Sequence, residues 1–285
     1  MPLGSIASDK QDVLPHWLRE RLRARVEGEI RLPVLPDTAC RVIAACRDEH
    51  SDLRALAELV THDQALAAHV LRVANSVAFA PKAPIEDLRQ ALSRLGLSTV
   101  SDITLALAIK QRAFSVPGHE SRIRELWLHS AATACYAQEV AQVSHGKRDS
   151  AFLLGLLHDV GMPITMQIVC DIVRERATDP VPQATMEQAM SEFHCELGAR
   201  LAQSWRLGPQ VSSAIRYHHD PAAAKPLASV IEVVALADEL AYWALDESRT
   251  EEDFTAGREL AVAQESLPAL LNLRAHVLEL SRAFL

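Results

Sequence analysis

The stretch Leu153-Leu154-Gly155-Leu156-Leu157-His158-Asp159-Val160-Gly161 places a histidine and an aspartate directly after an apolar run. A lone carboxylate in that position would be costly to bury. Asp159 therefore needs a cation, a metal ion or strong hydrogen-bond donors as a partner. A His-Asp pair is common by chance, so its meaning depends on what the rest of the chain places beside it.

Apolar residues on both sides of this stretch recur with the period of an α-helix. The stripes are Leu66, Val70, Val73 and Val77; Leu88, Ala91, Leu92 and Leu95; Val100, Ile103 and Leu107; Ile164, Ile168 and Ile172; and Val230, Val234, Ala237 and Ala241. Each stripe gives one apolar face that a neighbouring helix can cover. Strand patterns are hard to find, so we predict an all-α protein built as a multi-helix bundle.

Proline, glycine and aspartate interrupt this helical pattern at several places. The breaks are residues 32–37, 115–118, 178–182 and 220–221. Such residues are typical of turns, and Pro117-Gly118 marks the best internal boundary. We predict two packed helical units over residues 30–115 and 119–245, after an extension over residues 1–29. Helices over residues 255–285 are expected to pack back on this body.

Composition limits the classes of protein and partner. With 285 residues, of which 49% are apolar, the chain can bury one large core or two modest ones. A formal charge of -8 gives no electrostatic footprint for a polyphosphate backbone, so nucleic acid is not expected as a partner. The longest apolar stretches, such as residues 151–157 and 230–237, are shorter than the roughly 20 residues of a membrane helix. With no secretory signal at the N-terminus, we expect a cytoplasmic protein without a membrane partner.

The five cysteines contain no C-x-x-C pair, which argues against a zinc ribbon and against a disulfide framework. They are expected to be reduced core residues. The five are Cys40, Cys46, Cys135, Cys170 and Cys195.

Further histidines and a second aspartate are spread over the helices that surround the His-Asp pair. The candidate metal ligands are His129, His158, Asp159, His194, His218, His219 and Asp238. Asp238 lies four residues after Val234, on the apolar side of its helix, where an unpaired carboxylate would again be costly. The other seven histidines have no such company and are expected at the surface or half-buried. These seven are His16, His50, His62, His69, His119, His145 and His276.

Four short motifs in the first unit occur in an order that resembles the HDOD family. They are Pro33-Val34-Leu35-Pro36, Asp63-Gln64-Ala65-Leu66, Leu71-Arg72-Val73-Ala74-Asn75-Ser76 and Ala91-Leu92-Ser93-Arg94-Leu95-Gly96. Gln64 stands where the family usually has proline, a minor departure because a polar residue is acceptable in the first helical turn. Asn75-Ser76 is interpreted as a structural turn, because these side chains compete for backbone hydrogen bonds. The resemblance covers about residues 31 to 245 and implies two helical subdomains of HD type.

The order of the seven candidate ligands resembles that of the HD-domain phosphohydrolases and of their HD-GYP branch. Helices that converge in a bundle core can supply such ligands. The resemblance implies that Asp159 bridges two metal ions and that the histidines are terminal ligands. Imidazole and carboxylate together suit iron, manganese, nickel or zinc, so one or two such divalent ions are the expected cofactor. The alternative is a buried polar network that pairs its members without metal.

Two departures from the HD-GYP pattern bear on function. Met162 stands where that pattern has a lysine, so a cation that would neutralise substrate phosphate is missing. The chain also continues from His219 as Asp220-Pro221-Ala222-Ala223-Ala224, without the G-Y-P segment. These changes fit the HDOD family. The resemblance to that family implies a bacterial signal-transduction module that is not catalytic and that binds a signalling protein or a small nucleotide. The alternative is a metal-dependent phosphodiesterase that acts on a nucleotide or cyclic dinucleotide.

Overall fold

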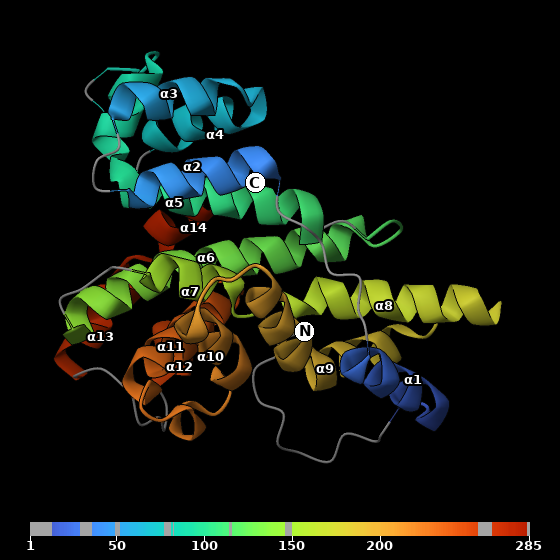
Figure 1. Ribbon diagram of the computed structural model, residues 1–285. Coiled ribbons are helices and arrows are strands. Elements are labelled where there is room, and N and C mark those ends of the chain that lie inside the picture. Colours follow the sequence, from blue (N-terminus) through green and yellow to red (C-terminus); the bar gives the residue numbers. More distant parts are fainter. Residues whose placement is uncertain are drawn as a thin grey trace.

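The computed structural model shows a helical protein with one group of helices above another (Figure 1). It describes residues 13–28, 36–48, 52–76, 81, 83–113, 116–145, 150–255 and 264–283. No strand occurs within these ranges, which confirms the prediction of an all-α fold. The predicted turn at residues 32–37 lies mostly outside them, and so does Ser115.

The helices follow the predicted breaks closely. The α-helices are α1 (His16–Glu27), α2 (Asp37–Arg47), α3 (Leu53–Thr61), α4 (Gln64–Ala74), α5 (Leu88–Ala113), α6 (Glu120–His145), α7 (Ala151–Leu157), α8 (Gly161–Arg176), α9 (Gln183–Ser204), α10 (Pro209–Tyr217), α11 (Ala228–Leu245), α12 (Glu251–Thr255), α13 (Leu267–Asn272) and α14 (Arg274–Ala283). Two short 3-10 helices are η1 (Pro221–Ala224) and η2 (Gln264–Ser266).

Helices α2 to α5 form the upper unit in Figure 1, and α5 is its longest member. The apolar stripe of α4 is buried at Leu66, Val70 and Val73, as its spacing predicts. Helix α5 is kinked at Gly96, whose φ of 78° and ψ of 160° are not helical. Only glycine adopts such a backbone without strain, so this residue fixes the angle between the two halves of α5.

Asn75 at the end of α4 is a structural residue. Its side-chain amide donates to the carbonyls of Leu71 and Ile85, both at 2.9 Å, and its Oδ1 accepts from the Ile85 amide at 2.8 Å. The adjacent Ser76 hydroxyl donates to the Val73 carbonyl at 2.7 Å. These bonds tie the loop that leads to α5 back onto α4, which confirms the interpretation of this pair as a turn.

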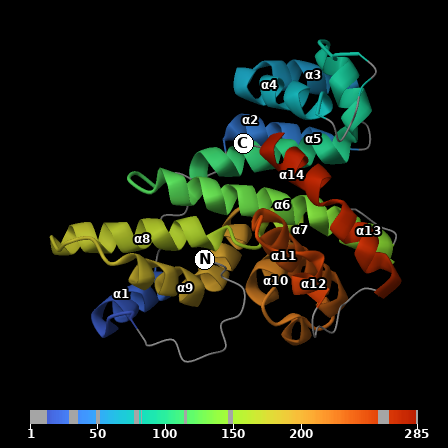
Figure 2. The same ribbon diagram turned by 180° about the vertical axis from the view of Figure 1, so that it is seen from behind.

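Helices α6 to α11 form the second unit, and α7 lies against the middle of α6 (Figure 2). The backbones approach closely where glycine allows it. A Cβ on Gly155 would lie 2.8 Å from backbone atoms of Thr133 and Ala134 on α6. A Cβ on Gly161, the first residue of α8, would overlap the carbonyl of His194 on α9. Glycine therefore lets α7 approach α6 and lets the start of α8 approach α9.

Segments from both ends of the chain pack on this second unit. Helix α1 lies along α8 and α9, where Arg19 pairs with Glu192 at 3.0 Å and Arg25 pairs with Glu175 at 2.6 Å. At the other end, α14 packs on α6. Its first residue, Arg274, donates to four backbone carbonyls at and beyond the end of α11.

Within the described residues, one segment is long and apolar enough to cross a membrane by length and composition alone. This segment is residues 151–176, which contain both α7 and α8. It is longer than the apolar stretch at residues 151–157, from which no membrane helix was expected. In the folded protein, 94% of its most apolar window is buried among the other helices. Its apolar character is therefore accounted for by its place in the core.

Candidate metal centre

The seven candidate ligands come together at the centre of the second unit. His129 lies on α6, His158 and Asp159 form the turn between α7 and α8, and His194 lies on α9. The remaining three are His218 and His219, which follow α10 directly, and Asp238 on α11. Each of these helices carries an apolar face into the same core, and the polar side chains project from those faces.

Asp159 is the hub of the cluster. Its Oδ1 lies 3.4 Å from Nε2 of both His194 and His218, and its Oδ2 lies 3.4 Å from Nε2 of His158. The residue is 3% exposed, so water does not compete for these oxygens. A charge-assisted hydrogen bond between nitrogen and carboxylate oxygen is shorter, at about 2.7 to 2.9 Å. The three rings therefore face Asp159 without binding it tightly.

Three of the histidine rings are oriented by the backbone. Nδ1 of His158 donates to the Gly155 carbonyl at 2.7 Å, and Nδ1 of His218 donates to the Ile215 carbonyl at 2.9 Å. Nδ1 of His194 makes the equivalent bond to the carbonyl of the residue four positions earlier, at 2.9 Å. A carbonyl on Nδ1 fixes the tautomer that leaves Nε2 free to ligate, which is the usual arrangement around metal-bound histidine.

His129 and Asp238 form the opposite side of the cluster. Nε2 of His129 lies 2.8 Å from Oδ1 of Asp238, and Nε2 of His158 lies 3.3 Å from the same oxygen. Tyr242, one turn after Asp238 on α11, covers the His129 ring at a centroid distance of 4.0 Å. Asp238 thus links the His129 side of the cluster to the His158 and Asp159 pair.

The electrostatics of the cluster divide its histidines into two kinds. Burial opposes charge on His158, but the carboxylates of Asp159 and Asp238 raise its pKa well above the ordinary value. Burial likewise opposes charge on Asp159, but His158 holds the pKa of that carboxyl well below its usual range. Burial lowers the pKa of His194, and burial together with His218 lowers the pKa of His219 to about 4. In the metal-free protein, His194 and His219 are therefore neutral and present lone pairs.

The donor set fits a divalent transition metal. Nε2 of His158 and Oδ1 of Asp159 are buried and have no hydrogen-bond partner, an arrangement that is costly unless a further group sits between them. Nε2 of His194 lies 3.4 Å from Nε2 of His218 and 3.2 Å from Nε2 of His219. Ligands around one tetrahedral ion with bonds of about 2.0 to 2.1 Å are roughly 3.3 to 3.4 Å apart, so these separations suit a common ion. The buried His and Asp clusters are able to hold metal.

The potential ligand atoms form two neighbouring groups. One group is His129, His158 and Asp159, and the other is His194, Cys195, His218 and His219; within each group these atoms lie within 4.8 Å of one another. Cys195 is an addition to the set predicted from the sequence. Its burial, with the charge of Asp159, raises the pKa of the thiol to about 12. All five cysteines are free thiols, but only Cys135 is buried as predicted. Cys40 is exposed, and the other three are half-buried: Cys46, Cys170 and Cys195.

The histidines outside the cluster include one that was placed wrongly from the sequence. His69 is 4% exposed and lies on α4 beside the apolar stripe of Leu66, Val70 and Val73. Both α3 and α5 pack on α4, so the buried face of this helix is wider than a single stripe.

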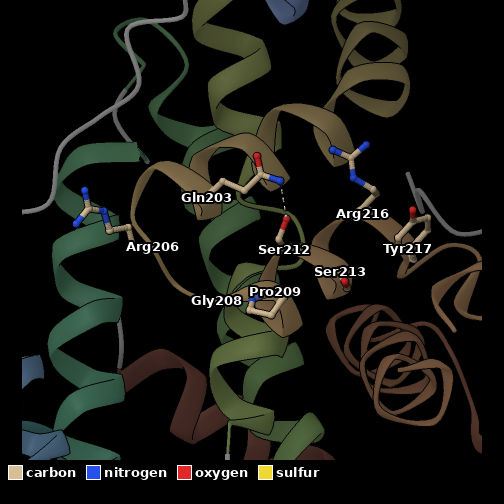
Figure 3. Close-up of a pocket in the computed structure, with 8 residues that line it drawn as sticks. All are labelled: Gln203, Arg206, Gly208, Pro209, Ser212, Ser213, Arg216 and Tyr217. Carbon is tan, nitrogen blue, oxygen red and sulfur yellow. Dashed lines mark hydrogen bonds between the residues drawn. The ribbon is translucent and has the colours of Figure 1, made fainter. Parts of the chain in front are cut away.

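A pocket of about 600 Å³ lies outside the cluster, where α9 ends and α10 runs across the surface (Figure 3). Arg206 and Arg216 lie on opposite sides of it, with Ser212 and Ser213 between them. Arg216 is also paired with Glu196 on α9. The lining consists of Gln203, Arg206, Gly208, Pro209, Ser212, Ser213, Arg216 and Tyr217, none of which is a candidate metal ligand.

Solved structures share this architecture. An HDOD domain protein of unknown function from Geobacter sulfurreducens is 27% identical, and the match covers 92% of this chain and 97% of that chain with a TM-score of 0.63. A candidate metal-dependent phosphohydrolase from Shewanella amazonensis SB2B is 22% identical, and the match covers 94% and 98% of the two chains with a TM-score of 0.72. At that identity the second likeness establishes the fold alone.

Sequence comparison gives the family. An uncharacterised protein from Treponema pallidum is 25% identical over 215 residues, which are 73% of this chain and 41% of that relative. This chain therefore covers less than half the length of the curated relative. The fold and the His/Asp cluster define a helical domain of HD type. The family model for the HDOD domain matches residues 32–221, and the chain belongs to the HDOD family.

Proposed function

We propose that this chain is a signal-transduction module without catalytic activity, in which one or two divalent transition metal ions hold the His/Asp cluster together. The burial of most of the cluster carries this proposal, although His219 at its edge is exposed. His158 is 0% exposed, Asp159 is 3% and His194 is 1%, so a phosphodiester has little access to the groups that would activate a water. Met162, buried at 3% exposure, brings no cation to this site.

Helix α10 connects the pocket at the surface to the cluster. Its outer face lines the pocket through Arg216 and Tyr217, and its end carries His218 and His219. Two arginines and two serines suit the phosphate groups of a small nucleotide, and the same surface suits an acidic segment of a signalling protein. A ligand that shifts α10 changes the position of two metal ligands, so ligand and metal binding are expected to be coupled in both directions.

The alternative function is a metal-dependent phosphodiesterase that acts on a nucleotide or cyclic dinucleotide. The donor set supports it, because Asp159 is placed to face histidines from both groups, as a bridging carboxylate would. The Shewanella protein of the same fold is described as a candidate metal-dependent phosphohydrolase. Catalysis also requires a substrate to be positioned at the metal, and Met162 stands where a lysine would pair with substrate phosphate.

One preparation separates the two functions. Bound metal is measured by mass spectrometry, and hydrolysis of a cyclic dinucleotide and of a generic phosphodiester is assayed with iron, manganese, nickel or zinc supplied. We expect bound metal without turnover. Asp159→Ala, assayed in parallel, separates true activity from contamination. Turnover in the wild type that this variant abolishes would establish the phosphodiesterase and overturn the proposal.

A further inference from the structure

Cys195 belongs to the group of candidate ligands that contains three histidines. Its Sγ is 3.2 Å from Nε2 of His194, and it belongs to the group completed by His218 and His219. The group therefore offers three imidazole nitrogens and one thiol sulfur. The other group, His129 with the His-Asp pair, offers nitrogen and carboxylate oxygen only.

A second observation points to a ligand at the same place. Oδ1 of Asp159 is buried, has no hydrogen-bond partner, and lies 3.4 Å from Nε2 of both His194 and His218. Nε2 of His194 and Nε2 of His219 also face each other, at 3.2 Å. A metal ion held by these nitrogens would also balance the charge of the neighbouring Asp159 carboxylate.

We propose that His194, Cys195, His218 and His219 form a thiolate-containing zinc site, and this proposal rests on the metal centre proposed above. Zinc suits the set because it accepts sulfur and nitrogen in a tetrahedral arrangement, with bonds of about 2.3 Å to sulfur and 2.0 to 2.1 Å to nitrogen. When zinc binds, the sulfur–zinc bond forms and the thiol proton passes to solvent.

The two halves of the cluster then differ in the metal they prefer. A thiolate favours zinc over manganese and iron, whereas a group with carboxylate and imidazole alone suits those harder ions. The cluster is therefore a centre with one zinc-selective half. Loss of the thiol should weaken zinc binding on the order of tenfold or more while it leaves the Asp159 side of the cluster in place.

Cobalt(II) is the probe, because a cysteine thiolate bound to cobalt gives a charge-transfer band in the near ultraviolet that imidazole and carboxylate do not give. We expect the band when the metal-free full chain is titrated with cobalt, and we expect Cys195→Ser to abolish it while cobalt still binds. Cys170→Ser is the matched control, because Cys170 Sγ also lies beside a histidine, 3.5 Å from Nε2 of His119, but outside the cluster. This control should keep the band.

The outcomes separate the two proposals. Cobalt binding with the same spectrum in the wild type and in Cys195→Ser overturns the thiolate site and leaves the metal centre standing. A folded wild type that binds neither cobalt nor zinc overturns the metal centre itself. Circular dichroism of each variant shows whether it is folded. Direct competition of zinc against manganese in Cys195→Ala gives a second measurement of the preference for zinc.

Discussion

Gly161 and His194 bring α8 and α9 into backbone contact: a Cβ on Gly161 would overlap the His194 carbonyl and would lie 2.8 Å from the Gly198 amide nitrogen. Both obstacles are backbone atoms, which cannot move without shifting a helix. We therefore expect Gly161→Ala to lower the free energy of unfolding by about 1 to 3 kcal/mol. Urea denaturation of the two proteins measures this difference. Because the shift also separates Asp159 from His194, metal affinity should fall in the same variant, and unchanged stability would contradict the observed packing.

Arg274 caps the C-terminal end of α11 with hydrogen bonds that a lysine cannot reproduce. Its guanidinium donates to the carbonyls of Trp243, Ala244, Asp246 and Arg249 at 2.7 to 3.3 Å. It also lies 4.5 Å from the centre of the Trp243 ring. Arg274→Lys keeps the charge but loses most of these bonds, so we expect a loss of about 2 kcal/mol in thermal or urea unfolding.

The matched control for this change is Arg282→Lys, at an exposed position on the same helix α14. It should alter stability by less than about 0.5 kcal/mol. Equal effects of the two substitutions would show that the guanidinium of Arg274 has no particular role.

His69 should make stability depend on pH. Burial, reinforced by the charges of Arg72 and Lys110, lowers its pKa from 6.5 to about 4. The unfolded chain therefore binds a proton at this residue more readily than the folded protein does. Its contribution is fully present above pH 6.5 and is lost as the pH falls toward 4. At pH 5 the loss relative to neutral pH should be about 2 kcal/mol.

Urea denaturation at pH 7 and pH 5 tests this in the wild type and in His69→Leu, which removes the titrating group. Other groups titrate over the same range, so the comparison between the two proteins is the informative one. The variant should lose about 2 kcal/mol less than the wild type between these pH values. Parallel losses would mean that His69 is not buried as a neutral ring.

The helices could be predicted because their apolar stripes are regular and the breaks contain proline or glycine. The kink at Gly96 was not foreseen, since a glycine inside a periodic segment gives no sign of its backbone angles. The contact of α1 with α8 and α9 was also missed. It depends on pairs such as Arg19 with Glu192, which are 173 residues apart in the chain.

The ligand order was visible because each histidine or aspartate adjoins an apolar helix or lies on one. Cys195 was not visible as a member of the cluster. Neighbouring residues on a helix point about 100° apart, so adjacency to His194 gave no reason to place both in one site. Tyr242 was missed for another reason. Its ring contacts His129 through the packing of α11 on α6, and the signal that could have found it is its spacing of four residues from Asp238.

Asp159→Asn tests the charge at the hub of the cluster. The amide keeps the shape of the side chain but removes the negative charge that faces His158, His194 and His218. Breaking one partner of a buried charged network usually costs about 2 to 4 kcal/mol, and we expect a loss of that size in the free energy of unfolding. An unperturbed variant would show that the carboxylate is not buried among these rings.

Melting curves with and without EDTA then distinguish a metal centre from a polar network. An ion that binds only the folded state adds RT ln(1 + [L]/Kd) to stability, so a chelator should lower the melting temperature of the metal-loaded wild type. The same chelator should have a smaller effect on Asp159→Asn, because that variant has lost the carboxylate that faces both groups of ligands. A wild type shown to be metal-free should ignore EDTA. If it does so, and Asp159→Asn is still unstable, the cluster is held by hydrogen bonds and ion pairs alone.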